Sequence, residues 1–131
     1  MGTCKQQGEW AELCFMARAA EMGLKVCKPY GDSAQWDVGI EREGRLIRVQ
    51  IKSTTFYRGR TFTCNVVGPG HRPYPRGTVD FFAIYLVPVD AWYIIPEEAM
   101  GRSSISLQFT PEKEGHRYEP YREAWHLLKQ L

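Results

Sequence analysis

Apolar and polar residues alternate on both sides of Glu43-Gly44, and this alternation predicts a β-hairpin. A two-residue turn at Glu43-Gly44 fixes the register of the two strands and places Asp37 opposite Gln50. Lys52 follows on the same face, so a carboxylate, an amide and an ammonium group should converge. The apolar positions recur at every second residue: Trp36, Val38, Ile40, Ile47, Val49 and Ile51.

Two interpretations of this polar cluster stay open. The first is an ordinary half-buried sheet whose polar face is solvated. The second is a binding site for a divalent cation and an activated water. A carboxylate that faces an amide and a lysine suits such a site. Gln50 and Lys52 interrupt the most apolar part of their strand near its end, which favours the second interpretation.

The rest of the pattern predicts helices around further strands. Residues 6–22 should form a helix that is buried on more than one side, and residues 68–77 should form a loop rich in glycine and proline. A final helix would carry Tyr121, Ala124, Trp125 and Leu128 on one face. Strands or extended segments are expected at 26–29, 60–67, 79–87, 92–95 and 104–109, with a short helix opening at Pro96. This order predicts an α+β fold with helices against a mixed β-sheet.

Glu12 is a candidate fourth member of the polar cluster. It lies on the same stripe of the first helix as Phe15, Met16 and Ala19. A carboxylate on such a stripe is costly to bury unless it meets a cation or a donor. The alternative is a charge near the helix start that interacts favourably with the helix dipole.

Composition narrows the class of protein. The 131 residues, 44% of them hydrophobic, suffice for a single domain over residues 1–131. A net charge of +2 permits a nucleic-acid partner without demanding one. The four cysteines form no CxxC pair, which favours reduced, mostly buried thiols in a cytoplasmic protein. The longest apolar run, residues 81–89, is too short to span a membrane, so no membrane association is expected.

Three segments together resemble the PD-(D/E)XK nuclease superfamily, in particular its small single-domain branch that includes intron-encoded homing endonucleases. They are QGEWAELCFMARAAEMGLKV, PYGDSAQWDVGIEREGRLIRVQIKS and VDFFAIYLVPVDAWYIIPEEA. The resemblance implies a restriction-endonuclease-like core with Glu12, Asp37, Gln50 and Lys52 as the active site. Trp36 stands where the superfamily name has proline, and Gln50 replaces the usual acid.

The function that the resemblance implies is a Mg²⁺-dependent DNA endonuclease, with Mn²⁺ as a substitute. Asp37, the Gln50 side-chain carbonyl and the Ile51 backbone carbonyl would hold the ion, with Glu12 bound directly or through water. Lys52 would orient or help deprotonate the attacking water and would offset phosphate charge. The products would carry 5′-phosphates.

Double-stranded DNA is the expected partner, and loops after the hairpin supply candidate contacts: Arg58, Arg60, His71, Arg72, Tyr74 and Arg76. An ordinary solvated loop with Tyr74 packed down is the alternative. A chain this small covers little DNA, so a homodimer or homotetramer is expected. A homing endonuclease, another nuclease acting in repair, junction resolution or restriction, and a catalytically silent DNA-binding or assembly module all stay open.

Overall fold

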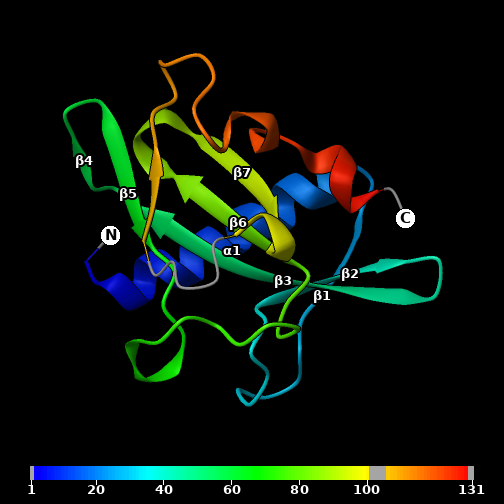
Figure 1. Ribbon diagram of the computed structural model, residues 1–131. Helices are drawn as coiled ribbons and strands as arrows, with labels where there is room; N and C mark the ends of the chain where they lie inside the picture. The colour runs from blue at the N-terminus through cyan, green and yellow to red at the C-terminus, as the bar shows by residue number, and fades with distance from the viewer. Residues whose placement is uncertain (1, 101–105, 130–131) are drawn as a thin grey trace.

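The computed structural model describes residues 2–100 and 106–129 and contains one five-stranded sheet, in the order β1-β2-β3-β6-β7 (Figure 1). β3 and β6 run parallel, whereas the other neighbours are antiparallel. The sheet is therefore mixed, as predicted. Its strands are β1 (Lys25–Cys27), β2 (Val38–Arg42), β3 (Arg45–Thr54), β6 (Phe81–Leu86) and β7 (Ala91–Pro96).

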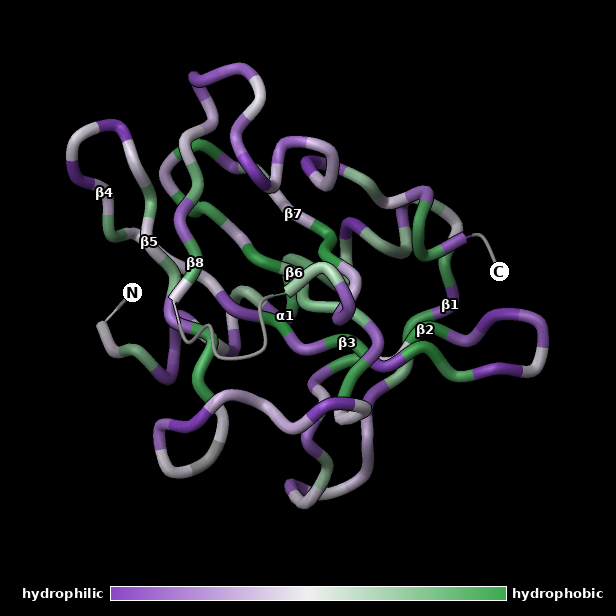
Figure 2. The backbone as a smooth tube through the Cα atoms, viewed as in Figure 1, coloured by the Kyte–Doolittle hydropathy of each residue, from purple (hydrophilic) through white to green (hydrophobic). Residues whose placement is uncertain are grey.

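The two faces of this sheet have different covers. Helix α1 (Cys4–Glu21) packs on one face through Ala11, Phe15 and Ala19. A three-stranded sheet packs on the other face, with the strand order β4-β5-β8. Its strands are β4 (Tyr57–Arg58), β5 (Thr61–Asn65) and β8 (Ser106–Phe109). Figure 2 shows apolar residues along β6 and β7, between the two covers, and polar residues on the outer loops.

The predicted hairpin register is confirmed. Glu43 and Gly44 both have positive φ, at 50° and 76°, as a tight two-residue turn between antiparallel strands requires. Arg42 pairs with Arg45, and the ladder ends at Val38 and Val49. Trp36 is the exception to the predicted face, because β2 begins only at Val38. Trp36 packs with the residues under the three-stranded sheet, whereas Val38 and Ile40 pack with those under α1.

Helix α1 is confirmed within two residues of the predicted range 6–22, but the prediction of burial on more than one side was wrong. The Thr3 side chain caps its start by accepting a hydrogen bond from the Gln6 backbone N–H. Only one face reaches the sheet, so Leu13 is 62% exposed, and Ala17 and Ala20 are also exposed. Apolar residues on the far side of this helix do not belong to the core.

The predicted final helix was also wrong, because the segment forms two short 3-10 turns, η4 (Glu119–Tyr121) and η5 (Trp125–Leu128). Glu123 between them has a positive φ of 50°, which breaks a continuous helix. Its carboxylate accepts hydrogen bonds at 2.8 Å from the Trp92 backbone N–H and from the Trp125 indole N–H. The segment is thus pinned to β7, and Trp125 is buried as the pattern predicted.

Smaller elements complete the comparison with the sequence. The short helix after Pro96 is a 3-10 turn, η3 (Glu97–Ala99), whereas β4 was not predicted. Two further 3-10 turns are η1 (Pro69–His71), within the predicted loop, and η2 (Val87–Val89). β8 is an edge strand as expected, although residues 104–105 of the predicted segment lie outside the described residues. Within the described ranges, no helix combines the length and the apolar character needed to cross a membrane.

The four cysteines are free thiols, but the expectation that most are buried was wrong. Cys4 and Cys27 are exposed, Cys14 is partly buried, and only Cys64 is buried. Burial raises the pKa of the Cys64 thiol to about 12, so this residue stays protonated and packs as a small apolar group.

Candidate active site

Asp37 lies at an open edge of β3. Because β2 begins at Val38, the last residues of β3 pair only with β6. The Asp37 side chain occupies this edge: its Oδ2 accepts a hydrogen bond of 2.9 Å from the backbone N–H of Ile51 and another of 2.9 Å from Nε2 of Gln50. The structure therefore brings Asp37 and Gln50 together as the hairpin register predicted.

The Asp37 carboxyl stands among several charges. Burial raises its pKa, the hydrogen bond from Ile51 lowers it, the charge of Glu12 raises it, and the charges of Lys52 and Lys28 lower it. The net shift is upward. Glu12, Lys52 and Lys28 are therefore the charged side chains that act on this carboxyl.

Lys52 lies on the same face of β3 as Gln50, and neighbouring groups hold its ammonium. Nζ donates to the backbone carbonyl of Val67 at 3.4 Å and lies 5.4 Å from the centre of the Tyr74 ring. Gln50 is 8% exposed, which is unusual for an amide side chain and consistent with its bond to Asp37. Gln50 is therefore a buried polar group, and Lys52 on the same face is half-buried.

Glu12 approaches from α1 and makes an ion pair that the sequence did not reveal. Its Oε1 lies 2.6 Å from Nζ of Lys28, and its side chain is 24% exposed. Lys28 directly follows β1, whose last residue Cys27 pairs with Gly39 of β2. The pairing of β1 with β2 was the missing information, because it sets Lys28 beside the strand that begins after Asp37.

An open pocket of about 320 Å³ lies over Asp37 and Gln50. The loop before β2 forms one wall and Tyr74 of the loop after β5 contributes another, and Figure 1 shows both loops at the same end of the molecule. The other residues that line it are Asp32, Ser33, Ala34 and Gln35. Solvent and a ligand can therefore reach this part of the site.

The donor atoms of the site suit a hard cation such as Mg²⁺. Three side-chain oxygens accept no hydrogen bond from the described residues: Oδ1 of Asp37, Oε1 of Gln50 and Oε2 of Glu12. The Ile51 carbonyl points to the same edge, because N–H and C=O of one strand residue face the same side and its N–H bonds Asp37.

Acidic ligands are scarce here. In the part of the chain that the structure describes, no three side chains of histidine, cysteine, aspartate or glutamate are grouped so that they could hold a metal ion. The amide at position 50 and the backbone carbonyl at 51 account for this result, because neither belongs to those four residue types. A metal at this site would depend on neutral oxygens as well as on carboxylates.

The candidate DNA contacts fall into two places. Arg58 and Arg60 are exposed on the β4–β5 hairpin, which Figure 1 shows apart from the loops that flank the pocket. His71, Arg72 and Arg76 are exposed on the loop after β5. Tyr74 instead packs inward, with its ring edge-on to Phe82 at 5.5 Å. The inward position agrees with the alternative that the sequence left open for this tyrosine.

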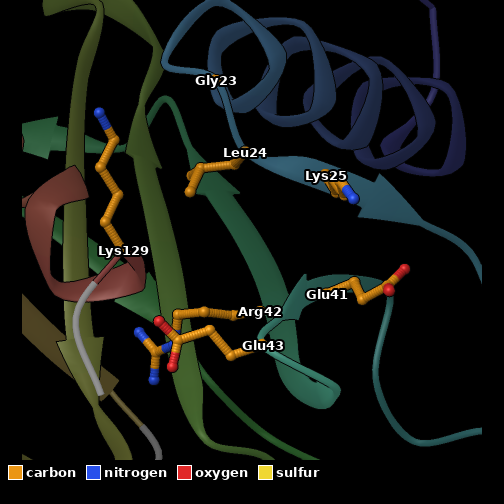
Figure 3. Close-up of a pocket in the computed structure, with 7 residues that line it drawn as sticks. All are labelled: Gly23, Leu24, Lys25, Glu41, Arg42, Glu43 and Lys129. Carbon is orange, nitrogen blue, oxygen red and sulfur yellow. The ribbon is translucent and has the colours of Figure 1, made fainter.

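A second open pocket, of about 270 Å³, lies at the opposite end of β2 from Asp37 (Figure 3). Its charged side chains have both signs: Lys25, Arg42 and Lys129, with Glu41 and Glu43. Arg42 donates to the backbone carbonyl of Leu127 at 3.2 Å, which ties the hairpin to the last turn of the chain. These contacts explain the pocket as a junction between two elements.

Comparison with known proteins decides the family. The family model for the PD-(D/E)XK endonuclease matches residues 2–128. The chain belongs to the PD-(D/E)XK endonuclease family. Members of this family generally use divalent metals, so a set of oxygen donors beside a lysine is consistent with membership. The resemblance of the sequence motifs and the restriction-endonuclease-like fold are thereby confirmed.

Two solved structures share the fold. A bacterial homing endonuclease, I-Ssp6803I, is 27% identical, with a TM-score of 0.77 over 98% of this chain and 92% of that one. Hjc, a Holliday junction resolvase from Archaeoglobus fulgidus, is 14% identical, with a TM-score of 0.58 over 95% of this chain and 98% of the other. Among curated protein sequences, none shows significant similarity.

Proposed function

We propose that this PD-(D/E)XK protein is a Mg²⁺-dependent endonuclease that hydrolyses phosphodiester bonds of double-stranded DNA. The observation that carries the proposal is the Asp37 carboxylate, held at the open edge of β3 by Gln50 and Ile51 with Glu12 and Lys52 nearby. Family membership supports the same conclusion, since it specifies nuclease chemistry for this fold.

The metal would be held by oxygen atoms from three elements. Asp37 and Gln50 would each supply a side-chain oxygen, Ile51 its backbone carbonyl, and Glu12 a carboxylate oxygen directly or through water. Mn²⁺ would substitute, because it accepts the same oxygen ligands. When bound, the ion supplies charge for the phosphate oxygens and lowers the pKa of a water molecule.

The chain's own residues would position the other participants. Lys52 would place its ammonium beside the scissile phosphate and the attacking water, where it offsets developing negative charge. The Val67 carbonyl and the Tyr74 ring, which itself lines the pocket, hold that ammonium before any ligand enters. Asp37 would orient the phosphate indirectly, by fixing Gln50 and the strand edge.

Homing is the biological role that we favour. The homing endonuclease I-Ssp6803I is similar over 98% of this chain, whereas the likeness to the junction resolvase is one of fold alone. DNA would be contacted through Arg58, Arg60, His71, Arg72 and Arg76. Tyr74 would contribute indirectly, because its ring holds the Lys52 ammonium. A homodimer or homotetramer would extend the contacted DNA beyond what one small chain covers.

A cleavage assay tests the function. The wild-type protein and Asp37→Asn would be incubated with long duplex DNA and with a four-way junction, in Mg²⁺, in Mn²⁺ and in EDTA. We expect the wild type to cut duplex DNA in either metal, EDTA to abolish cutting, and Asp37→Asn to bind DNA without cutting it. Cutting confined to the junction would replace homing by junction resolution. Tight binding of DNA with no cutting of any substrate would favour a catalytically silent module.

A further inference from the structure

The ion pair between Lys28 and Glu12 occupies one of the two oxygens of a carboxylate that the proposed metal would use, and it offsets the charge of that carboxylate. Nζ of Lys28 lies 2.6 Å from Oε1 of Glu12, a distance typical of a short charge-assisted hydrogen bond. The Lys28 side chain is 49% exposed, whereas that of Glu12 is 24% exposed. The lysine is therefore the more exposed partner, and the carboxylate that it contacts is the more buried one.

Two ammonium groups offset part of the carboxylate charge around Asp37 in this arrangement. Asp37 and Glu12 are two carboxylates, and Lys52 and Lys28 are two ammonium groups that act on the same neighbourhood. A divalent cation that enters here meets both ammonium groups, and Lys28 in particular offsets the charge of Glu12, which weakens the attraction of the cation. Binding would become favourable if one ammonium left and a phosphate arrived.

Lys28 is the ammonium that can leave. Lys52 is held by the Val67 carbonyl and the Tyr74 ring, whereas Glu12 is the sole partner of Lys28 among the described residues. Half of the Lys28 side chain already faces solvent, and a four-carbon stem allows the ammonium to swing away without moving the backbone. The backbone before it is anchored, since β1 pairs with β2 up to Cys27.

We propose that Lys28 is a positioning residue that couples metal binding to DNA binding. Without DNA, its ammonium forms an ion pair with the carboxylate of Glu12. When DNA binds, the ammonium pairs with a backbone phosphate instead, and the whole Glu12 carboxylate becomes available to the metal. The proposal rests on the nuclease function proposed above and deepens it. It means that the protein alone has low metal affinity and completes its metal site only on DNA, and that metal in turn raises DNA affinity.

Calorimetric titration of Ca²⁺ tests the coupling without any cleavage. The full chain would be titrated alone and with a short mixed-sequence DNA duplex, as wild type, Lys28→Met, Lys28→Arg and the control Lys25→Met. We expect Lys28→Met alone to bind Ca²⁺ about threefold more tightly, within the range for a partly exposed ion pair. The gain in Ca²⁺ affinity on adding DNA should shrink in Lys28→Met and persist in Lys28→Arg and Lys25→Met. Circular dichroism melting would verify that each variant is folded.

The outcomes separate this inference from the function on which it rests. If the wild type binds Ca²⁺ and Lys28→Met has an equal or lower Ca²⁺ affinity in the absence of DNA, Lys28 does not compete for Glu12 and the inference is overturned. An undiminished effect of DNA in Lys28→Met overturns it as well. If the wild type takes up no Ca²⁺ with or without DNA, the proposed metal-dependent function fails, and the inference fails with it.

Discussion

Nε2 of Gln50 donates a hydrogen bond to Oδ2 of Asp37 at 2.9 Å, so a neutral amide faces the carboxylate where the motif resemblance implies an acid. The amide donor stabilises the Asp37 carboxylate in the absence of metal, since burial alone raises the pKa of that carboxyl. An acid at position 50 would face another acid across the hairpin. The carboxylate of Asp37 thus favours a hydrogen-bond donor at position 50, whereas the proposed metal site would favour an acid there.

Gln50→Glu is expected to lower the stability of the metal-free protein and to raise its metal affinity. The loss of the hydrogen bond and the new repulsion should lower the free energy of unfolding by about 1 kcal/mol. Urea unfolding with and without Ca²⁺ would measure both effects, because metal should stabilise the variant more than the wild type. Gln108→Glu on the exposed side of β8 is the matched control. Equal stabilisation of Gln50→Glu and wild type by Ca²⁺ would argue against position 50 as a ligand.

Lys52→Met should remove cleavage while the protein stays folded. The methionine keeps much of the apolar stem that packs near Tyr74 but lacks the charge for the phosphate. We expect a loss of about 10²-fold or more in the single-turnover cleavage rate. Binding of duplex DNA in Ca²⁺ should change much less than the rate. Lys113→Met serves as the control, and a Lys52→Met rate within a few fold of wild type would exclude Lys52 from the reaction.

Asp80 makes stability depend on pH in the acid range. Burial alone would raise the pKa of this carboxyl, but hydrogen bonds from the Arg48 guanidinium and backbone N–H outweigh it and lower the pKa. A lowered folded-state pKa stabilises the protein above the unfolded-state pKa, and this contribution is lost as pH falls through the folded-state value.

Asp80→Asn should therefore be less stable than wild type at neutral pH, and the two should converge in acid. Thermal melts between about pH 7 and pH 3, a range that spans the ordinary aspartate pKa, would measure the difference. Glu114→Gln, an exposed position, should keep the wild-type profile. A constant difference between Asp80→Asn and wild type across the whole range would contradict the role of the ionised carboxylate.

Glu123→Ala should destabilise the end of the chain on β7. Its carboxylate satisfies the Trp92 backbone N–H and the Trp125 indole N–H, and both tryptophans are buried. Leaving these donors without a partner should lower the free energy of unfolding by about 1–3 kcal/mol. Chemical denaturation followed by tryptophan fluorescence would measure it, with Glu112→Ala as the exposed control. Stability equal to that of Glu112→Ala would show that water replaces the carboxylate at no cost.

The sequence by itself determined the features that depend on neighbouring residues. Alternation with a period of two and a glycine turn fixed the hairpin register, and that register alone brought Asp37 to Gln50. Helix periodicity gave the limits of α1 and put Glu12 on the same side as Phe15. Such patterns are local, because a strand or a helix dictates which side chains share a face whatever the rest of the chain does.

The tertiary structure decided what depends on contacts between distant segments. It paired β1 with β2, and so placed Lys28 against Glu12. It left Leu13 in solvent although the residue is apolar, and it bent the last segment into 3-10 turns around Glu123. These outcomes depend on which side of α1 the sheet covers and on which buried N–H donors need an acceptor. Those are properties of the assembled layers, and no periodicity along the chain encodes them.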